Sequence, residues 1–99
     1  MTSMDDPAYR LDWDDWNRDH ITKHGMSTDE VESVMGSDPI ANPSYKNRLI
    51  VIGPSYMDRM IAVVIGPSPH AADRWYVFSA RPASRQERAR YQQTKDAMP

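Results

Sequence analysis

The stretch Arg59-Met60-Ile61-Ala62-Val63-Val64-Ile65 decides the fold, because it is a strand candidate that contains the longest apolar run in the chain. Similar runs lie on either side, at residues 48–52 and 74–79. All three are apolar on both faces, so the sheet that they predict needs cover on both sides, from its own helices, from a second chain or from both. The connectors at residues 53–58 and 66–73 are short enough for hairpins, which predicts an antiparallel meander.

A short strand and a helix are expected before this sheet. Residues 9–13 alternate well enough for the strand, and Asp14 or Asp15 can then cap a helix that stops at Gly25. Four ring-bearing residues fall near one face of this segment at helical spacing. They are Trp13, Trp16, His20 and His24.

A second helix has both its start and its end marked in the sequence. Ser27-Thr28-Asp29-Glu30 fits a capping box, in which Ser27 bonds a free amide and Glu30 reaches back. Gly36, followed by Asp38-Pro39, ends this helix, and residues 42–44 are interpreted as irregular.

The chain closes with another helix. Pro82 is followed by a capping box in Ser84-Arg85-Gln86-Glu87 and a polar helix to about Lys95. The predicted fold is therefore an α+β domain: an antiparallel sheet of about four strands, two short N-terminal helices that cover it, and the C-terminal helix at its edge. We expect a flexible leader at residues 1–8 and a single domain at residues 9–95.

Composition narrows the class of protein. The 99 residues have room for one modest core, and the absence of cysteine excludes disulfides and thiolate metal sites. The longest apolar run is about a third of a membrane span, so we expect a soluble, cytoplasmic protein without a membrane partner. Residues 1–40 hold ten acids against three bases, whereas residues 41–99 hold nine bases against four acids. The basic half suggests an anionic partner, although arginines that solvate a small domain explain it at least as well.

The arginines best placed to hold phosphate lie in one strand-to-helix junction, residues 78–91. Arg81 sits where a rigid strand ends, which fixes its direction. Its alternative role is a salt bridge to the acidic N-terminal half. Arg85 lies in the first turn of the last helix, where free amides and the dipole favour an anion. A solvated helix face is the simpler interpretation of Arg85, Arg88 and Arg90.

Several motifs occur together in a fixed order: Trp13-Asp14, Lys23-His24-Gly25 before the helix led by Ser27, Ile52-Gly53-Pro54-Ser55, and the block from Ser79 to Tyr91. This ordered set resembles the BrnT toxin family over about residues 11–92. The resemblance implies a small RelE-like ribonuclease, the toxin of a bacterial type II toxin–antitoxin pair. Its partner would be a BrnA-type ribbon-helix-helix antitoxin that inhibits the toxin and represses the shared operon. The complex would be a hetero-oligomer with an antitoxin dimer, and operator DNA would be contacted only through the antitoxin.

The resemblance also points to Lys23 and His24 as an acid/base pair. His titrates near neutrality and Lys can hold a phosphate. The alternative for His24 is a favourable interaction with the helix dipole. The chain departs from the family at Asn17, where Lys is usual, and at His20, where Asn is usual. Either His20 replaces the missing lysine or it simply packs.

RNA cleavage without a metal needs attack by the 2′-hydroxyl, a base, an acid and positive charge on the phosphorane. We expect Arg81 and Arg85 on phosphate and His24 with Lys23 in proton transfer, with Arg59 as a further catalytic candidate. Further candidates are Glu87 as a base, Arg88 on phosphate and Tyr91 stacking on a base. Capping explains Glu87 more simply, and packing explains Tyr91.

No cofactor or metal is expected. His20 and His24 have the i, i+4 spacing of zinc-binding helices, but Glu does not follow His20.

Two other functions compete with the ribonuclease. A catalytically silent homologue would keep the antitoxin interface and act in operon repression, which the departures at Asn17 and His20 favour. A protein–protein adaptor unrelated to toxins would need only the apolar sheet faces and the acidic N-terminal half.

Overall fold

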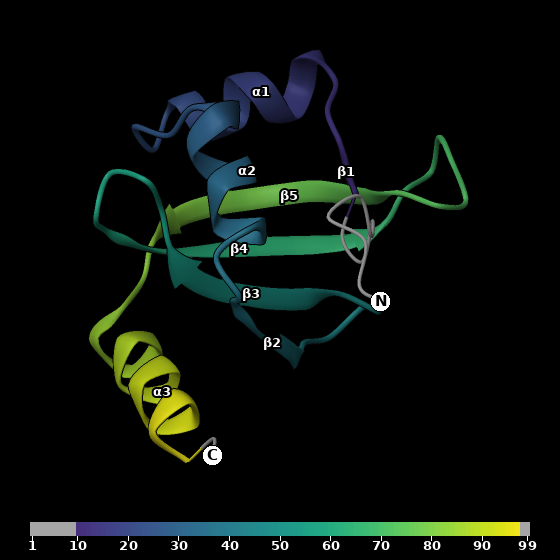
Figure 1. The fold of residues 1–99 in the computed structure, drawn as a ribbon. Coiled ribbons are helices and arrows are strands. Elements are labelled where there is room, and N and C mark those ends of the chain that lie inside the picture. Colours follow the sequence, from purple (N-terminus) through teal and green to yellow (C-terminus); the bar gives the residue numbers. More distant parts are fainter. Residues whose placement is uncertain (1–9, 98–99) are drawn as a thin grey trace.

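One five-stranded sheet forms the centre of the computed structural model, which describes residues 10–97. Its strand order is β1-β5-β4-β3-β2 (Figure 1). The strands are β1 (Leu11–Asp12), β2 (Ile40–Pro43), β3 (Leu49–Pro54), β4 (Met60–Pro67) and β5 (Trp75–Pro82). Strands β2 to β5 form the antiparallel meander that the three apolar runs predict. Strand β1 is parallel to β5, so the sheet is mixed.

The sheet has five strands rather than the expected four, because residues 42–44 are not simply irregular. Asn42 and Pro43 belong to β2, whose residues pair with β3 from Ile40↔Ile52 to Pro43↔Leu49. An Asn-Pro pair is typical of turns, so the sequence did not predict a strand here. The proline is tolerated because β2 is an edge strand of the sheet. The expected first strand is reduced to Leu11–Asp12, since Asp14 already caps the next helix, and Tyr9 lies outside the described residues.

Three helices surround the sheet: α1 (Asp15–Thr22), α2 (Thr28–Met35) and α3 (Arg85–Asp96). Ser84 and Glu87 form the predicted capping box at the start of α3. At α2 only half of the predicted box exists. The Ser27 hydroxyl accepts from the Glu30 amide at 3.1 Å, but the Glu30 side chain points into the protein. Among these helices none is long and apolar enough to cross a membrane.

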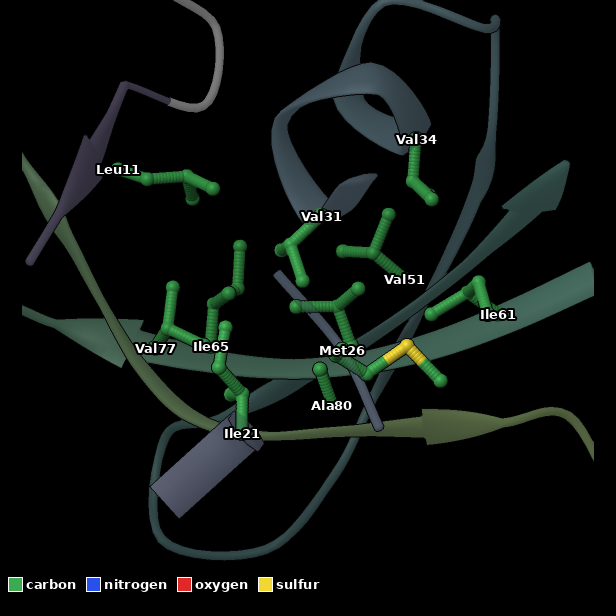
Figure 2. Close-up of a cluster of buried hydrophobic side chains, with 11 residues drawn as sticks. Leu11, Ile21, Met26, Val31, Val34, Val51, Ile61, Ile65, Val77 and Ala80 are labelled. Carbon is green, nitrogen blue, oxygen red and sulfur yellow. The ribbon is translucent and has the colours of Figure 1, made fainter. Parts of the chain in front are cut away.

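Both faces of the sheet are covered by the chain's own helices. The larger core lies under α1 and α2 and joins residues such as Ile21 and Val31 to Ile65 and Val77 (Figure 2). A smaller core on the other face is closed by Ala83 and by Tyr91 of α3. The C-terminal helix lies beside one end of the sheet (Figure 1) and contacts the second face there through Tyr91.

The departure at Asn17 has a structural explanation. Asn17 is fully buried, and its side chain and that of Asp14 cap α1 reciprocally, with N–O distances of 2.8 and 3.0 Å. The Asn17 amide also donates to the Asp12 carbonyl at 2.9 Å. This residue therefore joins the end of β1 to the first turn of α1.

Replacing Asn17 by Ala should lower the free energy of unfolding by about 1–3 kcal/mol, because it leaves buried backbone groups without partners. Urea denaturation measures the change. Gln93→Ala, which removes an exposed amide from α3, is the control and should change stability by less than about 0.5 kcal/mol. Equal stability of the two variants would contradict the structural role of Asn17.

Candidate active site and its flanking arginines

The turn after α1 presents Lys23 and His24 to solvent. Lys23 is the C-cap residue, and its ammonium lies 3.6 Å from the Asp19 carboxylate. The His24 ring meets the His20 ring edge-on, with 5.5 Å between centroids. Gly25 follows with a φ of 75°, a left-handed conformation that favours glycine. Both candidate acid/base residues are therefore exposed at the end of a short helix.

Arg59 is tied to this turn through a buried carboxylate. Its Nε and Nη2 donate to the two oxygens of Glu30, each at 2.6 Å, and Nη2 also donates to the Gly25 carbonyl at 3.0 Å. The Ser55 hydroxyl donates to Glu30 at 2.7 Å. The hydrogen bond from Arg59, helped by the one from Ser55, holds the pKa of Glu30 below its ordinary value against the opposing effect of burial. Arg59 thus links the turn, α2 and the β3–β4 connection.

Arg81 also has a carboxylate partner. Its Nη1 and Nη2 donate to the two oxygens of Glu87 at 2.6 and 2.9 Å, and the Ser84 amide donates to the same carboxylate at 2.8 Å. Chiefly because of the bond from Arg81, the pKa of Glu87 falls to about 2. The expected alternative role of Arg81 is a salt bridge to the acidic N-terminal half. Arg81 does form a salt bridge, but its partner is Glu87, the capping residue six positions further along the chain.

The rest of the junction is more open. Arg85 is exposed, and Arg88 donates to the Ala83 carbonyl at 3.0 Å while most of its side chain stays exposed. Tyr91 packs against the smaller core, with the Lys95 ammonium 5.5 Å from its ring. A hollow lined by Ser84, Gln86, Glu87 and Arg90 lies beside the start of α3.

These residues form two groups at one end of the sheet, where the α1–α2 turn, the β3–β4 connection and the end of β5 all lie (Figure 1). Residues of a strand alternate between faces. Ala80 belongs to the core under α1 and α2, whereas Arg81 pairs with Ala62 of the core under α3. The turn group (Lys23, His24, Arg59) therefore lies on the α1–α2 face. The α3 group (Arg81, Arg85, Glu87, Arg88, Tyr91) lies on the other.

His20 is not part of a metal cluster. No group of three His, Asp or Glu residues within residues 10–97 is arranged to hold a metal ion. The His20 ring instead stacks on Trp16, with 4.7 Å between centroids and 10° between planes. The helical spacing of Trp16, His20 and His24 is the signal from which this row could be found in the sequence.

A second polar cluster, at the other end of β5, was not anticipated from the sequence. The Asp12 carboxylate accepts from the Ser68 hydroxyl at 2.5 Å and lies 2.7 Å from His70 Nδ1. The Ser68 oxygen accepts from the His70 and Ala71 amides. Ser68 and His70 both bond Asp12, and no hydrogen bond joins their side chains, so the cluster fixes the β4–β5 connection and lacks the Ser–His contact of a nucleophilic site.

Comparison with known proteins shows a likeness to a solved structure. No protein-family model matches the chain, and no curated protein does. The chain is similar to a solved structure, the 1.1 Å crystal structure of the Brucella abortus ribonuclease toxin BrnT. The two share 28% identity and superpose with a TM-score of 0.60. The match covers 78% of this chain and 99% of that one.

The Arg81–Glu87 pair predicts a pH dependence of stability. A lowered carboxyl pKa contributes stability above the ordinary value of 4.5, and this is lost as pH falls towards about 2. The difference in unfolding free energy between the unmodified protein and Glu87→Gln should therefore be largest above pH 4.5 and shrink below it. Urea denaturation across this range measures it. In an Arg81→Met background the dependence should be weaker, and a difference that does not change with pH would contradict the assignment.

Proposed function

The chain is BrnT-like, and from this premise we propose that it is the endoribonuclease toxin of a type II toxin–antitoxin pair. The observation that carries the proposal is the match to a ribonuclease toxin over 99% of that toxin's length. The exposed histidine and lysine of the turn group supply chemistry that suits RNA cleavage.

We propose that cleavage needs no metal and takes place at the turn group. The 2′-oxygen attacks the adjacent phosphorus and the bond to the 5′-oxygen breaks, which leaves a 2′,3′-cyclic phosphate. His24 accepts the proton of the 2′-hydroxyl or donates one to the departing 5′-oxygen, water exchanges the other proton, and Lys23 contacts the phosphate. Arg59 faces the same turn. Its Nη1 makes no hydrogen bond within residues 10–97, and the side chain is 39% exposed, so this nitrogen can donate to a phosphate oxygen while Glu30 holds the rest.

The α3 group has a supporting role in this proposal. Arg81 keeps Nε without a hydrogen bond among the described residues, and Arg85 and Arg88 are exposed, so all three can meet further phosphates. Tyr91 is half-buried and can offer at most one ring edge to a base. We assign Glu87 to holding Arg81, since a carboxylate with a pKa of about 2 is a weak base. RNA that touches both groups passes around the end of the sheet.

The proposed partner is a BrnA-type ribbon-helix-helix antitoxin that binds as a dimer and contacts operator DNA for the complex. Expression of the neighbouring gene product with this chain tests the partner directly. Co-purification of a small ribbon-helix-helix protein would support it. A neighbour of another class that does not bind would contradict it.

A second function is favoured by one specific observation. Two of the candidate arginines are already bidentate to carboxylates, Arg59 to Glu30 and Arg81 to Glu87, which reduces the positive charge available to a phosphorane. A catalytically silent homologue that binds the antitoxin and takes part in operon repression fits this neutralised arrangement. Intact RNA after incubation with purified protein, together with harmless expression, would select it over the ribonuclease.

Induction in bacteria should arrest growth and cleave RNA, and His24→Ala should reduce cleavage by about 10²- to 10⁴-fold, the usual contribution of a general acid or base. Primer extension on total RNA and cleavage of a labelled RNA by purified protein are the two measurements. His70→Ala is the matched control, because His70 is also exposed but lies at the opposite end of β5. Equal loss in both variants would remove His24 from the mechanism.

Arg81 is best tested without leaving Glu87 unpaired, because a half-buried carboxylate without its partner destabilises the fold. The double variant Arg81→Met with Glu87→Gln removes both charges, and Glu87→Gln alone retains the arginine. If Arg81 binds phosphate, cleavage should fall about 10²- to 10³-fold in the double variant and stay near normal in the single one. Normal cleavage by a folded double variant would show that Arg81 is structural.

A further inference from the structure

Three rings form a row along the solvent side of α1, and the chemistry above uses only the last of them. Trp16 and His20 stack nearly parallel, with 4.7 Å between centroids. His20 and His24 then meet edge-on at 5.5 Å. We call Trp16, His20 and His24 the ring row. Its members follow each other at i, i+4 spacing, which places them on one side of the helix.

The ring row is not needed for the core. Trp16 is 57% exposed, and the buried side of α1 is formed by Asn17 and Ile21 instead. Since one face of the Trp16 ring is covered by His20, much of the remaining exposed area is available to another flat group. Trp16 thus presents a large, flat apolar ring to solvent on a polar helix, and a flat ligand can stack on it.

The row lies in the acidic half of the chain, but the charges beside it cancel in pairs and so do not repel a nucleic-acid strand. Lys23 lies three positions from His20 and seven from Trp16, on the same side of α1. The two acids of this helix, Asp15 and Asp19, are each within 4 Å of a base: 3.9 Å from Arg18 and 3.6 Å from Lys23. Exposed pairs of this kind are weak, so a phosphate can displace the carboxylate from Lys23.

The row also leads into the turn group. His24 belongs to both, and the carbonyl of the next residue, Gly25, accepts from Arg59 at 3.0 Å. The row of rings therefore ends one residue before the carbonyl that the Arg59 guanidinium binds. Stacking surfaces at one end and phosphate donors at the other are the two components of sites that hold single-stranded nucleic acid.

We propose that the ring row is a stacking platform for bases of single-stranded RNA next to the phosphate that is cleaved, with Trp16 as its principal surface. This inference rests on the proposed ribonuclease function and extends it to substrate binding. A base stacks on the open face of Trp16, and Lys23 contacts the phosphate between that base and the turn group. The departure at His20 is then explained, because an imidazole extends the stack from Trp16 towards His24.

RNA fits the row better than a protein partner does. Stable interfaces between proteins bury an apolar core made of several residues, and Trp16 is the only large exposed apolar residue on α1 within the described chain. Its neighbours in the row are imidazoles, and the helix around it carries charged pairs. Stacking on a base requires only one open ring face, and it tolerates any base because every base is flat.

The test measures binding of a fluorescein-labelled octanucleotide of 2′-O-methyl RNA, which cannot be cleaved, by anisotropy. Trp16→Ala should weaken binding roughly 5- to 150-fold, the usual effect of removing one stacked ring, whereas Trp16→Phe should retain most of the affinity. Tyr45→Ala is the matched control, since Tyr45 is 76% exposed in the connection between β2 and β3, away from the turn group, and should not matter. Trp16 is exposed and in a helix, so the alanine variant should fold.

A probe with abasic sites separates stacking from charge. It keeps the phosphates but lacks bases, so the unmodified protein should bind it more weakly than the normal probe, and Trp16→Ala should bind the two probes alike. Binding of the normal probe by Trp16→Ala at full strength would overturn the platform. An equal loss in Tyr45→Ala, or a loss of antitoxin binding without a loss of RNA binding, would also overturn it.

The platform and the ribonuclease can fail separately. If the unmodified protein binds the probe through Trp16 but leaves ordinary RNA intact, the platform stands and the proposed activity falls. If it cleaves RNA and Trp16→Ala binds and cleaves equally well, the activity stands and the platform falls. A protein that neither binds nor cleaves RNA overturns both.

Discussion

The buried carboxylate of Glu30 is the constraint on which the rest of the site depends. A charge that is 1% exposed must be paired, and its partners Arg59 and Ser55 both belong to the β3–β4 connection. Because Arg59 also holds the Gly25 carbonyl, the same interaction positions the turn that carries His24. One paired charge thus joins a helix, a hairpin and the candidate acid/base residue.

The sheet separates two groups of basic residues that the linear sequence suggests would act together. The turn group lies on the face of the sheet that α1 and α2 cover, and the α3 group lies on the opposite face. Each group contains an arginine that is bidentate to a glutamate. The positive charge of the second half of the chain is therefore partly neutralised at Arg59 and Arg81, two of the arginines proposed to contact phosphate. What remains open to an anion is the outer edge of each guanidinium, together with Lys23, Arg85 and Arg88.

Local signals predicted most of the fold. Three apolar runs became β3, β4 and β5, and Ser27, Ser84 and Asp14 cap the helices as expected, because a cap depends on residues within three positions. Strand β2 escaped prediction because its pairing with β3 is non-local and its sequence, with Asn42 and Pro43, is typical of a turn. The parallel pairing of β1 with β5 joins residues 64 positions apart, which no local pattern contains.

The sequence by itself determined which residue types are present for RNA chemistry and where helices and strands begin. It also determined the spacing that places Trp16, His20 and His24 in a row, since that spacing follows from helix geometry alone. Only the tertiary structure decided which carboxylate each arginine holds and on which face of the sheet it lies. The physical reason is that Arg59 and Glu30 are 29 positions apart, and that the face of Arg81 depends on the register of β5 against β4.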